Sequence, residues 1–209
     1  MIKDYKKVLK HFNDLDAKKR SEKFLEKFWL SLQELNDFWL PIKDKIFYSD
    51  SEDLPDLMFK EGYELMAQRG GILFTKEEYH ALQNCMRIAG DKYFVFIENK
   101  LSRIEESDLP HLRFKFPVET TWDMLNNGDE DFPDISFDIL FIMNKHFFVF
   151  GDSGKWGKYA ASNYYDTPLD IIGFKPEISA VFIESFNQSV QEQKEIKEWL
   201  PEDYKRIIQ

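Results

Sequence analysis

The amino-acid sequence predicts an α+β fold, in which a largely antiparallel sheet is flanked by helices and long helices lie toward both ends of the chain. Apolar residues follow helical spacing near both ends, and short aromatic runs cluster between them. Because these runs do not alternate one for one with helices, a parallel sheet is disfavoured. The 209 residues predict one domain, 1–209, in which a helical segment, 1–50, packs on a sheet-containing core, 51–209.

The first part of the chain carries helical signals. Apolar residues recur every three or four positions from residue 21 to residue 47, which predicts a long amphipathic helix that Pro41 bends or breaks. After a polar loop, a second helix is expected from near Pro55 to the Gly70-Gly71 pair. The spacing therefore places helices over most of the first 70 residues.

A third helix and the first strands follow. Thr75 and Glu78 have the spacing of a capping box, which predicts a helix that continues to Gly90. Residues 93–97 are aromatic and β-branched, as in a buried strand, whereas residues 112–116 alternate apolar and basic side chains, as in a half-exposed strand. A short helix is then expected over 121–126.

The later part of the chain predicts an antiparallel meander and a closing helix. Asn144-Lys145 is the expected turn of a β-hairpin, and the glycine turn at 151–154 leads into the next strand. A helix opens at Pro176 and is expected to extend toward Leu200. The strands predicted here are 137–143, 146–150, 158–162 and 168–174.

Charge and composition limit the classes of function. The net charge of −10 disfavours nucleic acid as a partner, because binding phosphates requires clustered Lys and Arg, and favours a basic protein. The first ten residues lack the apolar stretch of a secretory signal, and no apolar run of membrane-spanning length occurs, so we expect no membrane partner. Cys85 is the single cysteine, which suits a reducing compartment, and a cytoplasmic location is expected.

Two groups of residues are candidates for binding a partner. Acidic residues concentrate between residues 105 and 138, and such asymmetry can steer an oppositely charged protein. Tyr and Trp near the glycine turn are of the type favoured at interface centres, although packing of the sheet explains them equally well. The predicted partner-binding residues are Asp129, Glu130, Asp131 and Asp134 for steering, and Trp156, Tyr159 and Tyr164 as anchors.

A catalytic function is the alternative to binding. The Gly-Asp-Ser-Gly string at 151–154 matches the surroundings of the nucleophile in chymotrypsin-like proteases, so a hydrolase using Ser153 or a carboxylate pair is an alternative. The histidines show no metal-ligand spacing, and a phosphate-binding loop is excluded by its spacing. We therefore predict no catalytic residue, no metal and no cofactor. A structural or regulatory subunit of a homo-oligomer is a further alternative.

The stretch from 146 to 161 reads His-Phe-Phe-Val-Phe-Gly-Asp-Ser-Gly-Lys-Trp-Gly-Lys-Tyr-Ala-Ala. It resembles the strand, glycine turn and strand of the SUKH superfamily, known largely as bacterial immunity proteins that neutralise toxins. Leu54-Pro55-Asp56, leading to Gly70-Gly71, and the helix at 179–186 are similar to two further elements of that superfamily. The resemblance implies a non-enzymatic α+β scaffold that recognises a protein, often a basic, nuclease-like toxin.

Overall fold

The computed structural model contains one antiparallel sheet, which confirms the α+β class. Its strand order is β1-β6-β5-β4-β2-β3, and every neighbouring pair is antiparallel. The strands are β1 (Glu64–Arg69), β2 (Tyr93–Glu98), β3 (Arg113–Pro117), β4 (Phe147–Gly151), β5 (Trp156–Ala160) and β6 (Leu169–Phe174). The structure describes residues 4–11, 15–51, 54–69, 74–99, 110–126, 146–160 and 169–208.

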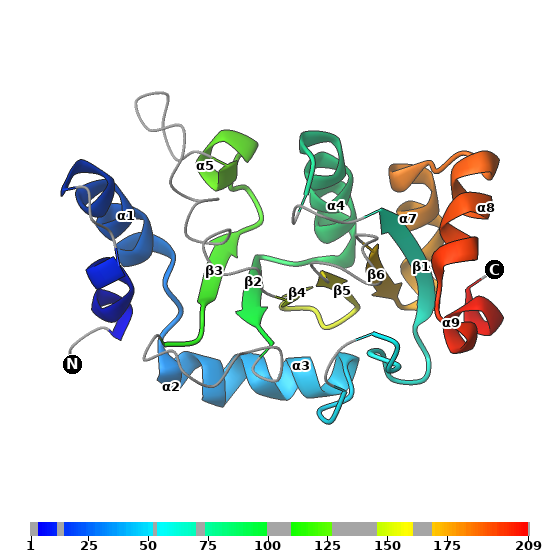
Figure 1. Ribbon diagram of the computed structural model, residues 1–209, viewed down its shortest axis with the longest axis horizontal. Helices are drawn as coiled ribbons and strands as arrows, with labels where there is room; N and C mark the ends of the chain where they lie inside the picture. Colours follow the sequence, from blue (N-terminus) through cyan, green and yellow to red (C-terminus); the bar gives the residue numbers. More distant parts are fainter. Residues whose placement is uncertain are drawn as a thin grey trace.

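Helices cover both faces of this sheet (Figure 1). Helices α1, α5, α4 and α7 lie on one face, α2 and α3 run along the other, and α8 and α9 stand beside β1. The helical elements are η1 (Asp4–His11), α1 (Leu15–Phe28), α2 (Leu32–Glu34), η2 (Leu35–Trp39), α3 (Leu40–Ile46), α4 (Lys76–Ala89), α5 (Trp122–Asn126), η4 (Pro176–Ile178), α7 (Ser179–Phe186), α8 (Val190–Trp199) and α9 (Glu202–Ile207).

Two hydrophobic clusters, one on each face, hold the layers together. In β4, Phe147 and Val149 belong to the cluster shared with α1, α4 and α7, whereas Phe148 and Phe150 belong to the cluster shared with α3 and α8. Successive side chains of a strand point to opposite faces, so burial on both faces requires an uninterrupted apolar run. This explains why the central strands were readable in the sequence.

The helix predicted over residues 21–47 is interrupted in the structure. After α1, Trp29 forms an isolated β-bridge with Phe114 of β3. The helix then restarts after Ser31, whose side chain accepts a hydrogen bond from the N–H of Glu34. The interruption carries the chain from one face of the sheet to the other (Figure 1), which one continuous helix could not do.

Pro41 does not break the second helical stretch. A π-helical turn, η2, precedes it, and the N–H of Leu40 bonds to the carbonyl of Leu35. Pro41 then occupies the first turn of α3, where a missing N–H costs little. The chain therefore stays helical across this proline.

The helix predicted from Pro55 to Gly70 is wrong. Gly62, at φ +84°, turns the chain, and β1 then pairs with β6 over six residues. The segment is rich in strong helix formers such as Leu, Met, Glu and Lys, which explains the error. Pairing with a buried neighbouring strand outweighs that local preference.

Other local predictions are confirmed. In α4 the N–H of Glu78 donates to Thr75 Oγ1 at 3.2 Å and the N–H of Thr75 donates to Glu78 Oε2 at 2.6 Å, which completes the capping box. Gly90 ends this helix at φ +86°. Strand β3 is present, but Arg113 in it is buried rather than half-exposed, because it donates to Asp4 and to the carbonyl of Leu30.

The predicted C-terminal helix is divided in two. Asn187, in the left-handed conformation, ends α7, and α8 begins after Ser189 and ends before Leu200, as expected. The predicted strands at 146–150, 158–162 and 168–174 correspond to β4, β5 and β6, whereas residues 137–145 lie outside the described residues.

Candidate functional site

The predicted partner-binding residues fall into two groups. Five of them lie outside the described residues: Asp129, Glu130, Asp131, Asp134 and Tyr164. The other two, Trp156 and Tyr159 of β5, are fully buried on opposite faces of the sheet, against Phe182 and Phe148 respectively. Of the two explanations that the sequence left open for this pair, the structure supports packing, so neither ring is available to a partner here.

The glycine turn that contains Ser153 is organised by a buried carboxylate from another part of the chain. Asp91 Oδ2 accepts a hydrogen bond from Trp156 Nε1 at 2.6 Å, and Asp91 Oδ1 accepts one from the Ser153 N–H at 2.7 Å. A Cβ at Gly151 would lie 2.3 Å from Asp91 Cγ, so only glycine allows this approach. Burial raises the pKa of Asp91 above its usual value, although these hydrogen bonds oppose the shift.

The serine hydroxyl of this turn also has a structural partner. Ser153 Oγ accepts a hydrogen bond from the N–H of Lys155 at 3.2 Å, and Asp152 Oδ1 accepts one from the N–H of Lys92 at 2.9 Å. Through these hydrogen bonds, Asp91 and Asp152 both fasten the turn to the loop before β2. The residues that suggested a hydrolase thus have a structural explanation.

A second set of polar groups lies in β5 and β6 and at His146, just before β4. Lys158 Nζ lies 2.8 Å from Asp170 Oδ2, and both side chains are excluded from solvent. Tyr159 and His146 meet through the hydroxyl and Nδ1 at 3.0 Å. Desolvation offsets much of the attraction within a buried ion pair, so this pair is weak evidence for added stability.

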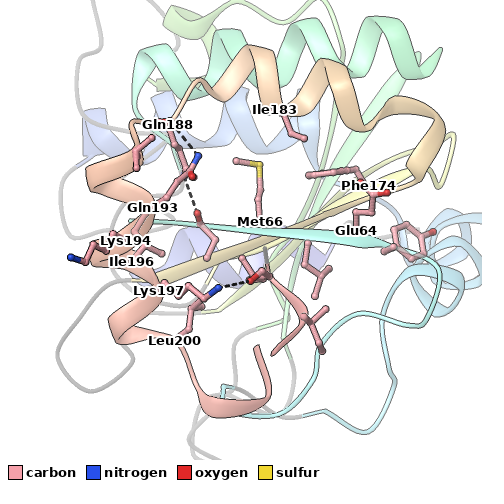
Figure 2. Close-up of a pocket in the computed structure, with 16 residues that line it drawn as sticks. Glu64, Met66, Phe174, Ile183, Gln188, Gln193, Lys194, Ile196, Lys197 and Leu200 are labelled. Atoms are coloured by element: carbon pink, nitrogen blue, oxygen red, sulfur yellow. Dashed lines mark hydrogen bonds between the residues drawn. The ribbon is translucent and has the colours of Figure 1, made fainter. Parts of the chain in front are cut away.

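A groove of about 620 Å³ lies at the edge of the sheet formed by β1 (Figure 2). Its walls come from β1, the end of β6, α7, α8 and the end of α9, which places residues 63–67 beside residues 183–208. Most of the lining is apolar, and a few polar side chains stand among these residues, the composition expected of a binding site. The lining residues used below are Leu65, Met66, Ala67, Ile183, Gln188, Val190, Lys194, Ile196, Lys197 and Leu200.

Hydrogen bonds and an ion pair tie the walls of the groove to β1. Ser179 Oγ donates to Glu64 Oε2 at 2.5 Å at the start of α7, and Gln188 Nε2 donates to the Ala67 carbonyl at 2.8 Å between α7 and α8. Arg69 pairs with Glu195 of α8 at 2.5 Å. These contacts hold the walls of the groove in place without a partner, so the groove is preformed. A preformed groove reduces the conformational entropy that is lost on binding.

Exposed apolar side chains extend the groove onto the surface. Ile183 is 58% exposed and Val190 is 83% exposed, and both stand at the side formed by α7 and α8. Two lysines, Lys194 and Lys197, lie on the α8 wall and are exposed. An apolar surface with a polar rim is suited to contact with another polypeptide.

Sequence reasoning missed this groove for two reasons. Its floor, β1, was predicted as a helix, and its walls come from residues more than 100 positions later in the chain. The available signal was Val190, an apolar residue at the start of the mostly polar stretch 191–198.

Comparison with known proteins gives no relative for this chain: no family model, curated protein or solved structure matches it. In the described part of the chain, no helix combines the length and the apolar character that crossing a bilayer would need.

Proposed function

We propose that this protein is a non-enzymatic protein-binding module of the immunity type, and that its partner is a basic, toxin-like protein. The preformed apolar groove along β1 carries this proposal. It offers a contact surface with exposed Ile183 and Val190, whereas the turn that suggested catalysis is explained by its own hydrogen bonds. The resemblance of residues 146–161 to the SUKH element supports the same class of function.

The charge of the chain supports a basic partner. A net charge of −10 produces a long-range attraction that speeds association and falls with added salt. In this proposal the acidic residues Asp129, Glu130, Asp131 and Asp134 contribute to steering, and the groove provides the short-range contact. Steering and contact are separate tasks, so they need not involve the same residues.

Co-expression with the product of the neighbouring gene tests the proposal. We expect the two proteins to co-purify at moderate salt and to separate at high salt. Ile183→Asp should weaken capture by roughly tenfold or more, because it places a charge in the apolar contact. Ile88→Asp is the matched control: Ile88 is 53% exposed on α4, away from the groove, and its substitution should leave capture unchanged.

Absence of association would contradict the proposal, as would association that does not depend on salt. Equal capture by Ile183→Asp and Ile88→Asp would retain the binding function but move the contact away from the groove.

A further inference from the structure

Strand β1 is an edge strand, and the hydrogen-bonding pattern of its neighbour shows which of its main-chain groups face outward. The N–H of Lys175 bonds to the carbonyl of Lys155. Main-chain groups alternate in direction along a strand, so those of Gly173, Ile171 and Leu169 in β6 also point toward β5. The main-chain groups of Phe174, Ile172 and Asp170 therefore point toward β1. They form the hydrogen-bonded pairs with Glu64, Met66 and Gln68. Consequently the N–H and C=O groups of Leu65 and Ala67 point away from the sheet.

A side chain from the groove confirms this direction. The Ala67 carbonyl accepts its hydrogen bond from Gln188, which lies outside the sheet. Among the described residues, no other partner is found for the outward main-chain groups of Leu65 and Ala67. Unpaired edge groups are a template for pairing with another chain, and a strand paired at Ala67 would replace the hydrogen bond from Gln188.

The groove encloses this edge from both faces of the sheet. Met66 packs with the cluster of α4 and α7 and faces Ile183, whereas Leu65 packs with the cluster that contains Ile196 and Leu200 (Figure 2). An extended polypeptide presents alternate side chains to opposite sides. One strand laid along β1 would therefore place its side chains on both apolar walls at once.

We propose that the groove binds an extended segment of the partner protein, which adds to the sheet as a seventh strand beside β1. The segment is identified by its chemistry: alternating apolar side chains, and an acidic side chain on the α8 side. Lys194 and Lys197 supply the complementary charge there, and Lys197 Nζ also donates a hydrogen bond to the Ile208 carbonyl at 3.4 Å. Main-chain pairing supplies affinity and the two walls supply specificity. This inference rests on the proposed protein-binding function.

Peptide selection followed by amide hydrogen exchange tests the proposal. A displayed library of random 12-residue peptides is panned against the full chain, and the tightest binder is added to isotopically labelled protein. In the free protein, the amides of Leu65 and Ala67 should exchange much faster than those of Met66 and Gln68, which pair with β6. With the peptide bound, the Leu65 and Ala67 amides should become at least tenfold slower.

Two variants separate strand addition from simple apolar contact. Leu65→Pro removes an outward N–H without removing a bond to β6, so the sheet should be retained and peptide affinity should fall about tenfold or more. Ile183→Asp should weaken the peptide similarly through the apolar wall, and Ile88→Asp should not. Because Ile183→Asp leaves β1 unchanged, it remains informative if Leu65→Pro does not fold.

The proposal is overturned if the library yields no binder, or if the binders leave the exchange of the Leu65 and Ala67 amides unchanged. It is also overturned if these amides become protected without peptide as the protein concentration rises, because that would indicate pairing of two copies of the chain. If the neighbouring gene product binds without protecting these amides, strand addition fails and the proposed function stands. If peptides protect them but that product does not bind, the groove stands and the basic partner is wrong.

Discussion

Asp91 illustrates how one buried side chain can account for a motif that suggested catalysis. Its carboxylate accepts from the indole of Trp156 and from the amide of Ser153, and its close approach requires a glycine at position 151. A buried carboxylate is costly unless donors surround it, so each of these residue types has a structural requirement. The Gly-Asp-Ser-Gly string is therefore sufficiently explained by the turn that it builds.

Trp156→Phe should destabilise the protein by about 2 kcal/mol, because it removes a hydrogen-bond donor from a buried carboxylate. The free energy of unfolding in urea measures this loss. Trp199→Phe, at a residue 37% exposed on α8, is the matched control and should cost clearly less. Equal losses in the two variants would show that the Asp91 contact contributes little.

At the scale of helices and strands, the sequence was informative where local chemistry decides the structure. The capping residues Thr75 and Glu78 and the stop at Gly90 depend on neighbours within one or two turns, and all three were readable. Strand β1 was not predicted, because its helix-forming composition is overridden by pairing with β6, more than 100 residues away. Trp29 escaped prediction for the same reason, since its β-bridge partner is Phe114.

The junction between α7 and α8 offers a test at this scale. Asn187 has φ +37°, a conformation that costs little for Gly and about 1 kcal/mol for Ala. Asn187→Ala should therefore lower the free energy of unfolding by about 1 kcal/mol, and Asn187→Gly should change it by less than about half of that. Urea denaturation of both variants decides the matter, and an alanine variant as stable as the glycine variant would contradict the assigned conformation.

Across the whole molecule, the α+β class was predictable and the candidate site was not. Burial on both faces makes the central strands visible as apolar runs, which is enough to recognise the sheet. The groove exists only after residues 63–67 and 183–208 have been brought together by the strand order. No local pattern encodes that proximity. Trp156 and Tyr159 were predicted as anchors for a partner, but both are fully buried and pack against the two faces of the sheet.

The single domain predicted from the length of the chain has a direct test. The N-terminal helices contribute to both clusters, and Asp4 joins Trp29 to Arg113 of β3, so we expect the segment 1–50 to unfold together with the sheet. Far-UV circular dichroism and tryptophan fluorescence should then give coincident transitions in urea. Two separated transitions would indicate that the N-terminal segment is an independent unit.

The two borders of the sheet differ, and this limits how the protein can assemble. The outer side of β3 is occupied by its own chain, through the bridge of Trp29 with Phe114 and the bond from the Leu30 N–H to the Arg113 carbonyl. These contacts hinder head-to-tail joining of copies, β1 to β3, which would produce an open-ended filament. Association through the sheet is therefore expected at the β1 border rather than at the β3 border.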